Sequence, residues 1–322
     1  MYILTGGAGF IGSNILKALN ERGINDIIVV DNLTRNEKFK NIVGLHFNDY
    51  IDKTDLLNYI SAGKIKKVTA IIHHGACSDT TESNGKYMMD NNYSYSRILA
   101  EYAVTHDIPF IYASSASVYG IGENGFSESF QCETPINIYA YSKYLFDQWV
   151  RKNIHAISST FVGLRYFNVY GPNEYHKGKM SSMVLQAFQQ IKNTRKIKLF
   201  KGYGNIKDGE QSRDFIYIDD VISIVMFFID SHSKKGIFNV GTGKARTFNE
   251  LARVLIDCNS AGEIEYIPFP DELKGKYQNH TQAELGALRS AGYVNEFISL
   301  ENGIKKYVKI LLGDSKHGNQ NV

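Results

Sequence analysis

The opening segment of the chain constrains its fold more than any other. The apolar run Tyr2–Thr5 leads into glycines at positions 6, 9 and 12, and an amphipathic helical pattern follows. This strand–turn–helix order is typical of a dinucleotide-binding site. Gly6 permits a tight turn after the strand, Gly9 lets a pyrophosphate approach the backbone, and Gly12 lets the helix pack closely on the sheet. The helix N-terminus then presents free N–H groups to the phosphates.

Further apolar runs are expected to form strands at Asp26–Asp31, Thr69–His73, Phe110–Ser114 and Phe161–Tyr166. Because these runs are continuous and helical patterns separate them, they indicate a parallel sheet buried on both faces. With the glycine turn after the first strand, the order predicts an α/β fold built on a doubly wound, Rossmann-type sheet.

The second half of the chain is less regular. We expect a helix over Met180–Lys192, a short strand over Lys196–Phe200 and a helix over Phe248–Cys258. The segment Ile264–Gln278 is expected to form a strand and an ordered loop. These elements predict a smaller C-terminal α/β domain that binds the substrate.

A chain of 322 residues is long enough for one large domain or two. We expect a dinucleotide-binding domain over residues 1–168, with returns near 214–242 and 284–293. The substrate-binding domain is then expected to cover 169–213 and 243–322.

The composition excludes several classes of protein. The formal charge of +3 is too small, and the basic residues too scattered, for a nucleic-acid partner. Cys77, Cys132 and Cys258 lie far apart and fit neither a disulfide framework nor metal-ligand spacing, which favours a reducing compartment. No apolar run reaches the length of a membrane span. We therefore expect a cytoplasmic protein with no metal, membrane or nucleic-acid partner.

An acidic residue lies about twenty residues past the glycine turn, where a carboxylate can bond the hydroxyls of an adenosine ribose. This residue, Asp31, closes the second predicted strand. Such a carboxylate usually selects NAD, because it repels a 2′-phosphate. Asn32, Arg35, Lys38 and Lys53 lie nearby, however, and two cations can neutralise a 2′-phosphate. The residues favour NADP and leave NAD possible, and each lysine alone is also compatible with a solvated surface position.

A tyrosine and a lysine that share one helix face predict acid–base chemistry beside the dinucleotide. Tyr139 and Lys143 are four residues apart. A nearby ammonium and an oxidised nicotinamide ring favour the phenolate and lower the tyrosine pKa, and the lysine can also bond the nicotinamide ribose. Ser115, at the end of a predicted strand, can donate a hydrogen bond to the reacting oxygen. The alternative is an ordinary amphipathic helix surface.

Motifs along nearly the whole chain resemble the extended short-chain dehydrogenase/reductases, which are nucleotide-sugar epimerases, dehydratases and reductases. Besides the glycine turn, Ser115, Tyr139 and Lys143, these motifs are His73–Ala76, Asn91, Arg165–Pro172, Arg213–Phe215 and Phe238–Gly243. The resemblance implies a nicotinamide dinucleotide as cofactor and a homo-oligomer.

Four longer stretches narrow the resemblance to the ADP-L-glycero-D-manno-heptose 6-epimerase family. These stretches are Gly75–Ser78, Lys86–Tyr93, His176–Gly178 and Ile264–Gln278. The resemblance implies NADP-dependent inversion at C6 of ADP-heptose, by transient oxidation to a ketone and return of the hydride, for lipopolysaccharide core heptose supply. ADP-heptose is then the expected small-molecule partner.

The narrower resemblance also implies the site residues. Lys177 becomes a second acid/base opposite Tyr139, although by its sequence surroundings it is also compatible with an exposed lysine in a polar loop. The implied cofactor-binding residues are Gly6, Gly9, Phe10, Ile11, Gly12, Asp31, Asn32, Lys38, Lys53, His74, Gly75, Ala76, Cys77, Ser78, Asn91, Lys143, Val169 and Lys177. The implied substrate-binding residues are Ser115, Asn168, Lys179, Gln186, Phe200, Lys201, Gly202, Tyr203, Arg213 and Tyr277.

Three of these positions depart from the family pattern. Lys179 and Gln186 stand where a serine and a histidine are expected in the substrate pocket, and His74 stands where a glutamate is expected beside the cofactor.

Arg213 suits a diphosphate because its planar guanidinium can bond two oxygens. A surface salt bridge with Asp214 or Glu210 is the alternative interpretation of Arg213.

Two rival functions stay open at the level of sequence. A UDP-hexose 4-epimerase or a nucleotide-sugar 4,6-dehydratase shares the fold, but a dehydratase is expected to carry an Asp-Glu pair where Ala116 and Ser117 follow Ser115. A non-catalytic dinucleotide-binding sensor is the rival from another class. Such proteins often lose the tyrosine or the lysine, and this chain keeps both Tyr139 and Lys143.

Overall fold

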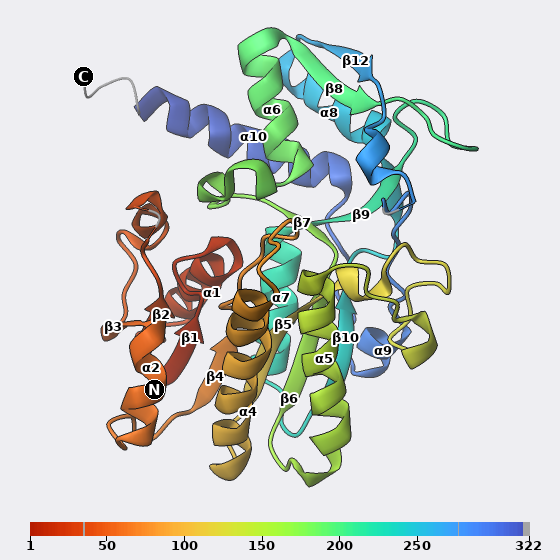
Figure 1. Ribbon diagram of the computed structural model, residues 1–322. Helices are drawn as coiled ribbons and strands as arrows, with labels where there is room; N and C mark the ends of the chain where they lie inside the picture. The colour runs from red at the N-terminus through yellow and green to blue at the C-terminus, as the bar shows by residue number, and fades with distance from the viewer. Residues whose placement is uncertain (35, 276, 318–322) are drawn as a thin grey trace.

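The computed structural model describes residues 1–34, 36–275 and 277–317 (Figure 1). Its main sheet has seven parallel strands in the order β10-β6-β5-β4-β1-β2-β3. This order confirms the predicted Rossmann-type sheet. The strands are β1 (Tyr2–Thr5), β2 (Ile27–Asp31), β3 (Asp49–Asp52), β4 (Ala70–His73), β5 (Phe110–Ser115), β6 (Phe161–Tyr166) and β10 (Lys235–Val240).

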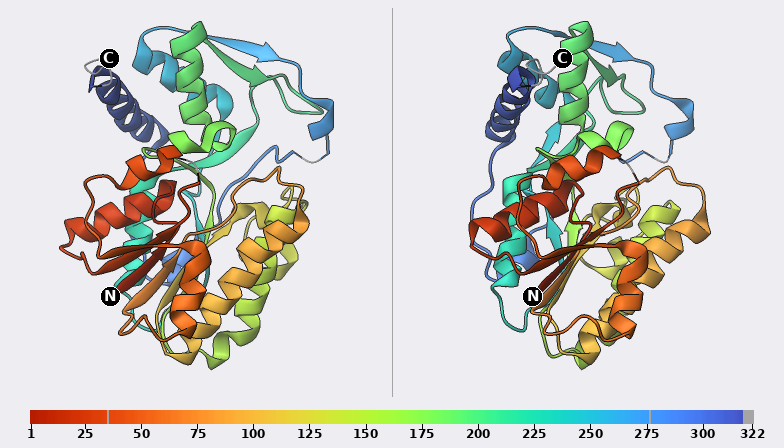
Figure 2. Two further views of the ribbon diagram at one scale, coloured as in Figure 1. Left: turned by 60° about the vertical axis from the view of Figure 1, so that its left-hand side comes forward. Right: turned by 90° about the vertical axis from the view of Figure 1, so that its left-hand side faces the viewer.

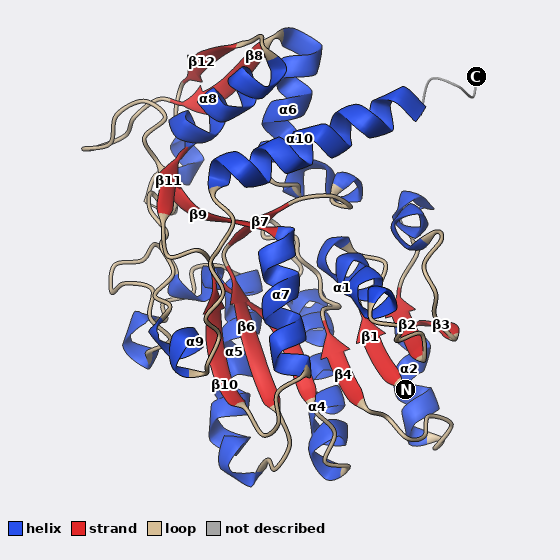
Figure 3. Cartoon of the chain, turned by 180° about the vertical axis from the view of Figure 1, so that it is seen from behind, coloured by secondary structure: helices blue, strands red, loops and turns tan. Residues whose placement is uncertain are grey.

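Helices cover both faces of the main sheet, which is why its strands are apolar throughout. On one face α1 (Phe10–Glu21) packs against α7 (Ile218–Ile229), as Figure 3 shows from behind. On the other face lie α2 (Lys53–Ser61), α4 (Tyr95–Thr105) and α5 (Ile138–Asn153) (Figure 1). The short helices α3 (Gly85–Met89) and α9 (Gly286–Ser290) complete this part of the chain.

A second group of elements lies beyond the carboxyl ends of the main strands (Figure 2). It contains a parallel pair of strands, a three-stranded sheet and three helices. Strand β9 lies at the centre of the three-stranded sheet, between β11 and β7, and β7 follows directly after β6 of the main sheet. The elements are α6 (Met183–Thr194), α8 (Phe248–Asn259), α10 (Leu300–His317), β7 (Asn168–Tyr170), β8 (Lys196–Phe200), β9 (Ser212–Tyr217), β11 (Ala245–Thr247) and β12 (Glu263–Ile267).

The structure corrects one predicted helix. The helix expected over Met180–Lys192 begins at Met183, because the Ser182 hydroxyl accepts a hydrogen bond from Leu185 N and caps the first turn. Residues Tyr175–Met180 form a separate short turn instead. Lys276, within the predicted Ile264–Gln278 segment, and Arg35, one of the cations predicted near a 2′-phosphate, lie outside the described residues. The two-domain division stays a prediction.

Two elements had no clear signal in the sequence. Helix α7 carries apolar residues on most of its surface because it lies between the main sheet and its neighbours, and periodicity alone does not distinguish so apolar a run from a buried strand. Strand β3 is short and only partly buried. Among the described residues, no helix is long and apolar enough to cross a membrane.

Candidate active site

One cleft follows the carboxyl ends of the main strands, from the glycine turn past β5 to the segment before α6. This is the edge of an open α/β sheet where ligands bind. Every residue predicted to bind the cofactor lines it: Gly6, Gly9, Phe10, Ile11, Gly12, Asp31, Asn32, Lys38, Lys53, His74, Gly75, Ala76, Cys77, Ser78, Asn91, Lys143, Val169 and Lys177.

The glycine turn leaves room that larger residues would fill. Gly6 has φ +69°, and a Cβ there would lie 2.7 Å from the backbone of His74 and Gly75. A Cβ on Gly12 would lie 2.0 Å from the Gly6 carbonyl oxygen. Gly12 is therefore required by the turn itself, whereas the sequence pattern predicted a role in packing on the sheet.

The first turn of α1 fits a pyrophosphate. Its N-cap residue, Gly9, offers no side-chain cap, and no acidic residue stands in the first turn. The free N–H groups at a helix N-terminus, together with the positive end of the helix dipole, favour an anion there. The residues present therefore fit the phosphates of a dinucleotide.

The Asp31 carboxylate faces the cleft and also bonds neighbouring groups of the protein. Its carboxylate accepts hydrogen bonds from Ala8 N at 2.9 Å and Asn32 N at 2.7 Å, and it forms an ion pair with Lys38. The acid thus ties the end of β2 to the glycine turn, and Lys38 offsets its negative charge. The predicted bond from Asp31 to a ribose stays a prediction.

Lys53 reaches the same end of the cleft from the start of α2. Its ammonium donates to Asn91 Oδ1 at 2.6 Å, and Asn91 Nδ2 donates to the Tyr87 carbonyl at 2.7 Å. These bonds hold a positive charge where the sequence pattern predicted contacts with the adenosine half of a dinucleotide.

The predicted catalytic groups of β5 and α5 lie together. Lys143 is 6% exposed, and its ammonium donates to the Ala113 carbonyl at 2.9 Å. Tyr139 forms a hydrogen bond with the Ser115 hydroxyl. The Ser115 hydroxyl also accepts from Ser117 Oγ at 2.9 Å and from Ser117 N at 3.2 Å, so its own proton is free to donate.

Burial dominates the proton affinities of these groups. It lowers the pKa of Lys143 to about 8. It raises the pKa of Tyr139, and the Ser115 hydrogen bond opposes that rise. The sequence pattern predicted a lowered tyrosine pKa from the neighbouring ammonium, and in this structure that prediction is wrong because desolvation outweighs the Ser115 hydrogen bond. The lowering by an oxidised nicotinamide ring stays a prediction.

Lys177 enters the cleft from the side of the second group of elements, which we call the second lobe, on the turn before α6. Its ammonium lies over the Phe10 ring, 5.7 Å from the ring centroid. Burial lowers the pKa of Lys177, and the Glu174 charge partly opposes this. The side chain is therefore less solvated than the exposed-lysine interpretation requires, and it faces the cleft that Tyr139 also lines.

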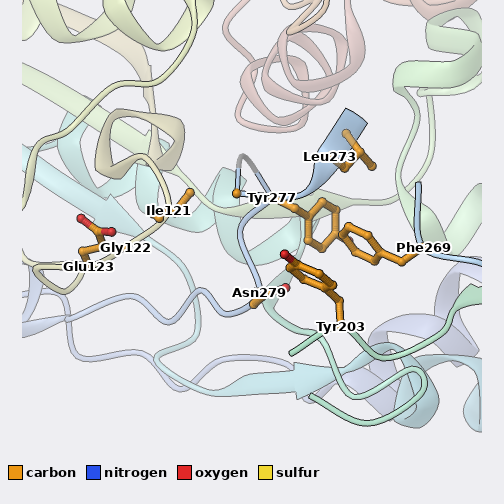
Figure 4. A pocket seen from close by; sticks show the side chains of 9 residues that line it. Ile121, Gly122, Glu123, Tyr203, Phe269, Leu273, Tyr277 and Asn279 are labelled. Carbon is orange, nitrogen blue, oxygen red and sulfur yellow. The ribbon is translucent and has the colours of Figure 1, made fainter. Parts of the chain in front are cut away.

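A second, aromatic cavity lies in the second group of elements, away from the main cleft (Figure 4). The ring of Tyr203 stacks on Phe269 at 5.4 Å, and Tyr277 meets Phe269 edge-on at 5.4 Å. A loop that carries Ile121 and Glu123 forms the other side of the cavity. Stacked aromatic rings suit the flat face of a nucleobase.

Arg213 lies buried behind this aromatic cavity. Its guanidinium stacks on Tyr277 at 4.8 Å and on Phe248 at 5.6 Å, and it donates to the Ser212 carbonyl. Burial lowers the pKa of Arg213. Asp214 instead accepts from Thr242, Gly243 and Ala283, so the predicted alternative of a surface salt bridge with Asp214 is wrong.

The other alternative partner of Arg213 is also engaged elsewhere. Glu210 accepts from Asn249 Nδ2 at 2.5 Å. The described residues thus give Arg213 no ion pair, and a buried cation of this kind favours an anionic ligand.

Only some of the predicted substrate residues line a cavity. Ser115 and Asn168 line the main cleft, and Tyr203 and Tyr277 line the aromatic cavity. The others line neither cavity: Lys179, Gln186, Phe200, Lys201, Gly202 and Arg213. Of these, Phe200 still contacts the rings of Phe269 and Tyr277, so it supports the aromatic cavity from behind.

Of the three residues that depart from the family pattern, Gln186 bonds the backbone of the segment that carries Lys179. Gln186 Nε2 donates to the Ser181 carbonyl at 2.7 Å and to the Lys179 carbonyl at 3.2 Å, and the Lys179 side chain is exposed. Gln186 therefore holds the turn before α6. Contacts of both side chains with a substrate stay predictions.

Comparison with known proteins agrees with this geometry. Residues 2–241 match the NAD dependent epimerase/dehydratase family. The chain belongs to this family. An NAD(P) dinucleotide is the cofactor typical of the family, in keeping with the glycine turn at the uncapped start of α1.

Individual members of the family are similar over nearly the whole chain. The ADP-L-glycero-D-manno-heptose-6-epimerase of Brachyspira hyodysenteriae is 51% identical over 315 residues, covering 97% of this chain and 98% of that protein. The crystal structure of the Helicobacter pylori ADP-L-glycero-D-manno-heptose-6-epimerase has a TM-score of 0.85 at 34% identity, covering 97% and 96%. A UDP-N-acetylglucosamine 4-epimerase from Methanobrevibacter ruminantium has a TM-score of 0.84 at 25% identity, covering 97% and 98%.

Sequence reasoning missed several residues of both cavities. Phe269 sits at the centre of the aromatic cluster, and His176 lines the main cleft beside Lys177. Both lie in stretches that carried the family resemblance, so the signal was present without a role attached. No sequence pattern revealed Glu174, because its role depends on hydrogen bonds with Gly171, which precedes it in the chain, and with Ser182, which follows it.

Proposed function

We propose that this chain interconverts ADP-D-glycero-manno-heptose and ADP-L-glycero-manno-heptose by inverting C6 of the sugar. The observation that carries the proposal is that Tyr139 and Lys177 line one cleft from different lobes, together with Lys143 and the glycine turn. The 51% identity to a heptose epimerase supports this substrate over a UDP-hexose.

We propose NADP as the cofactor, with NAD as the alternative. The glycine turn would hold its pyrophosphate, and Lys38 and Lys53 would face a 2′-phosphate. The Lys38 ion pair supports this choice, because it offsets the Asp31 charge that would repel a 2′-phosphate. When bound, the dinucleotide supplies a nicotinamide ring that accepts a hydride and returns it.

The protein residues move protons and orient the sugar. In one orientation Tyr139 would take the proton of the C6 hydroxyl as the hydride leaves C6, while Ser115 donates a hydrogen bond to the same oxygen. The resulting ketone would turn in the cleft and present its other face. Lys177 would then give a proton to the oxygen as the hydride returns, and the two groups exchange roles in the reverse direction.

Lys143 would support the tyrosine. Its ammonium, held by the Ala113 carbonyl, favours the Tyr139 phenolate through its positive charge and can bond the nicotinamide ribose. The burial of Lys143 and the partial burial of Tyr139 exclude water, which strengthens this interaction.

The substrate nucleotide would occupy the second lobe. The adenine would stack in the aromatic cavity of Tyr203, Phe269 and Tyr277, and Arg213 would meet the diphosphate. Asn168, which lines the main cleft at the start of β7, would contact the sugar. We also expect a homo-oligomer that works in the cytoplasm, as the family resemblance implies.

The test is turnover of both ADP-heptose epimers by the purified protein without added reductant, followed by NMR of the C6 proton. Because the same hydride returns, reaction in heavy water should place no deuterium at C6. Deuterium at C6 would indicate loss of a carbon-bound proton instead. Fast conversion of UDP-glucose to UDP-galactose without heptose turnover would overturn the substrate and leave the fold unaffected.

A further inference from the structure

Glu174 is a fully buried acid that the proposed reaction does not use. It is 0% exposed and precedes the turn Tyr175–Met180. Its Oε1 accepts hydrogen bonds from Ser182 Oγ at 2.7 Å and from Gly171 N at 3.3 Å, and its Oε2 accepts from Ser182 N at 2.5 Å. Burial of a carboxylate costs desolvation free energy, and these three hydrogen bonds offset part of that cost.

These bonds close a loop. Glu174 stands at the start of the segment 174–182 and Ser182 at its end, so one carboxylate joins both ends. Ser182 is also the N-cap of α6, and its hydroxyl accepts from Leu185 N while donating to Glu174. The carboxylate therefore lies at the N-terminal end of a twelve-residue helix, where the helix dipole favours a negative charge.

Lys177 lies inside this closed loop. Its backbone N–H donates to the Glu174 carbonyl at 3.0 Å, and Gly178, with φ +54°, turns the chain back toward Ser182. Asn41 holds the segment from the other lobe, since its Nδ2 bonds the Asn173 carbonyl at 3.2 Å. The direction in which the Lys177 side chain crosses the cleft is thus determined by how this loop is closed.

We propose that the Glu174 carboxylate is a positioning residue that holds Lys177 across the cofactor cleft, toward the Phe10 ring. The proposal rests on the proposed function for the acid/base role of Lys177, but the position of Lys177 itself does not depend on it. Glu174 acts through the loop and through its charge, and it does not reach the reacting atoms.

The charge of Glu174 follows from its partners. Two of its three donors are backbone N–H groups, which cannot accept a proton, so the bonds favour the ionised carboxylate. Burial raises the pKa of Glu174, and these bonds and the Lys177 charge oppose the rise. The other titratable group that faces it is Tyr307 of α10, whose pKa is raised first by burial and then by the Glu174 charge.

The experiment compares Glu174→Gln with Ser182→Ala in the full-length protein. Glu174→Gln keeps the size of the side chain but removes the charge, and its NH2 group leaves one of the two backbone N–H donors without an acceptor. Ser182→Ala removes a bond to Glu174 and the cap of α6 but leaves the charge in place. Trace acetylation of Lys177, read by peptide mass spectrometry from about pH 6 to about pH 10, reports its titration without requiring turnover.

In Glu174→Gln the Lys177 titration should move to lower pH, and its labelling at neutral pH should rise severalfold, because a stabilising negative charge is lost. Epimerisation should slow by about ten- to a hundredfold through misplacement of Lys177, with little change in KM. In Ser182→Ala the thermal midpoint should fall without a shift in the Lys177 titration.

The outcomes separate the two proposals. An unchanged Lys177 titration and near-normal turnover in Glu174→Gln would overturn the positioning role while leaving the epimerase intact. A shifted titration in a protein that does not turn over ADP-heptose would support the positioning role and overturn the proposed function. A shift of equal size in Ser182→Ala would show that loosening of the loop, and not the carboxylate, sets the state of Lys177.

Discussion

The Lys143 ammonium donates a hydrogen bond to the carbonyl of Ala113, two residues before Ser115. The bond fixes a helix side chain against the end of strand β5, so the lysine charge and the serine hydroxyl keep a constant separation. Tyr139, one helical turn earlier, bonds Ser115 directly. A strand and a helix together thus hold the proton-transfer groups rigidly.

The buried lysine predicts a pH dependence. The pKa of Lys143 is lowered to about 8, so its charge is present below that pH and lost above it. Because that charge favours the Tyr139 phenolate, kcat/KM should fall as the pH rises through about 8. Lys143→Arg keeps a charge that does not titrate in this range. A pH profile of the variant should lack the fall, and a fall at the same pH would assign it to another group.

The two-base site predicts equal losses at two distant residues. Tyr139→Phe removes one hydroxyl, and Lys177→Met removes one charge while keeping the stem. Each should slow epimerisation by about a hundred- to ten-thousandfold, the usual contribution of one acid/base group, and leave cofactor affinity largely unchanged. Assays of epimerisation stopped at fixed times measure the rate, and titration with the cofactor measures its affinity.

The matched control for this pair is Lys198→Met, which removes an exposed lysine of β8 in the same lobe as Lys177. It should turn over normally. Near-normal turnover by Lys177→Met with cofactor bound would return Lys177 to the status of an ordinary loop lysine.

The sheet was predictable because its signals are local. Apart from β3, each strand of the first half shows as a continuous apolar run, and the glycine turn identifies the first of them. The observed bounds differ from the predicted ones by one residue at most in β2, β4 and β5. Tyr139 and Lys143 were predictable for the same reason, since four residues on one helix place them together.

The unpredicted features depend on contacts distant in sequence. Arg213 is buried between Tyr277 and Phe248, which come from separate elements, so no local pattern reveals that it lacks a carboxylate partner. The pKa of Tyr139 rises because other elements cover it, which a helix periodicity does not express. Contacts made by folding, rather than residue types, decide both.

Cofactor preference gives a third prediction. Replacing Lys38 and Lys53 together by methionine should weaken NADP binding far more than NAD binding, because only NADP carries a 2′-phosphate. One lost charge-assisted hydrogen bond costs about 1.5–3 kcal/mol, roughly tenfold in affinity or more. Titration of both cofactors checks this, and equal weakening would contradict the assignment of these lysines to the 2′-phosphate.

The buried ion pairs beneath the site predict a stability effect. Arg165 and Asp147 are both 0% exposed and form an ion pair at 2.8 Å, and Asp147 also accepts from Tyr112 at 2.8 Å. Asp147→Asn leaves the Arg165 charge underpaired and should lower the free energy of unfolding by about 3–5 kcal/mol.

The control for Asp147 is the exposed pair of Lys86 and Asp90, where Asp90→Asn should cost less than about 1 kcal/mol. Urea unfolding measures both variants. Equal effects at the two sites would mean that Arg165 retains its charge compensation from Glu133 alone.

Arg213 predicts a trade of stability against substrate affinity. Its buried cation has no ion pair among the described residues, so only the Ser212 carbonyl and two ring faces offset its desolvation until an anion binds. Arg213→Met keeps the stem between Tyr277 and Phe248 and removes the charge. The KM for ADP-heptose should rise about tenfold or more, from loss of about 1.5–3 kcal/mol of charge-assisted bonding. The free energy of unfolding should stay the same or increase, since a buried charge without an ion pair is gone.

Kinetics and urea unfolding of one preparation measure the KM and the free energy of unfolding of Arg213→Met. A large loss of stability with an unchanged KM would assign Arg213 to the fold and not to the diphosphate.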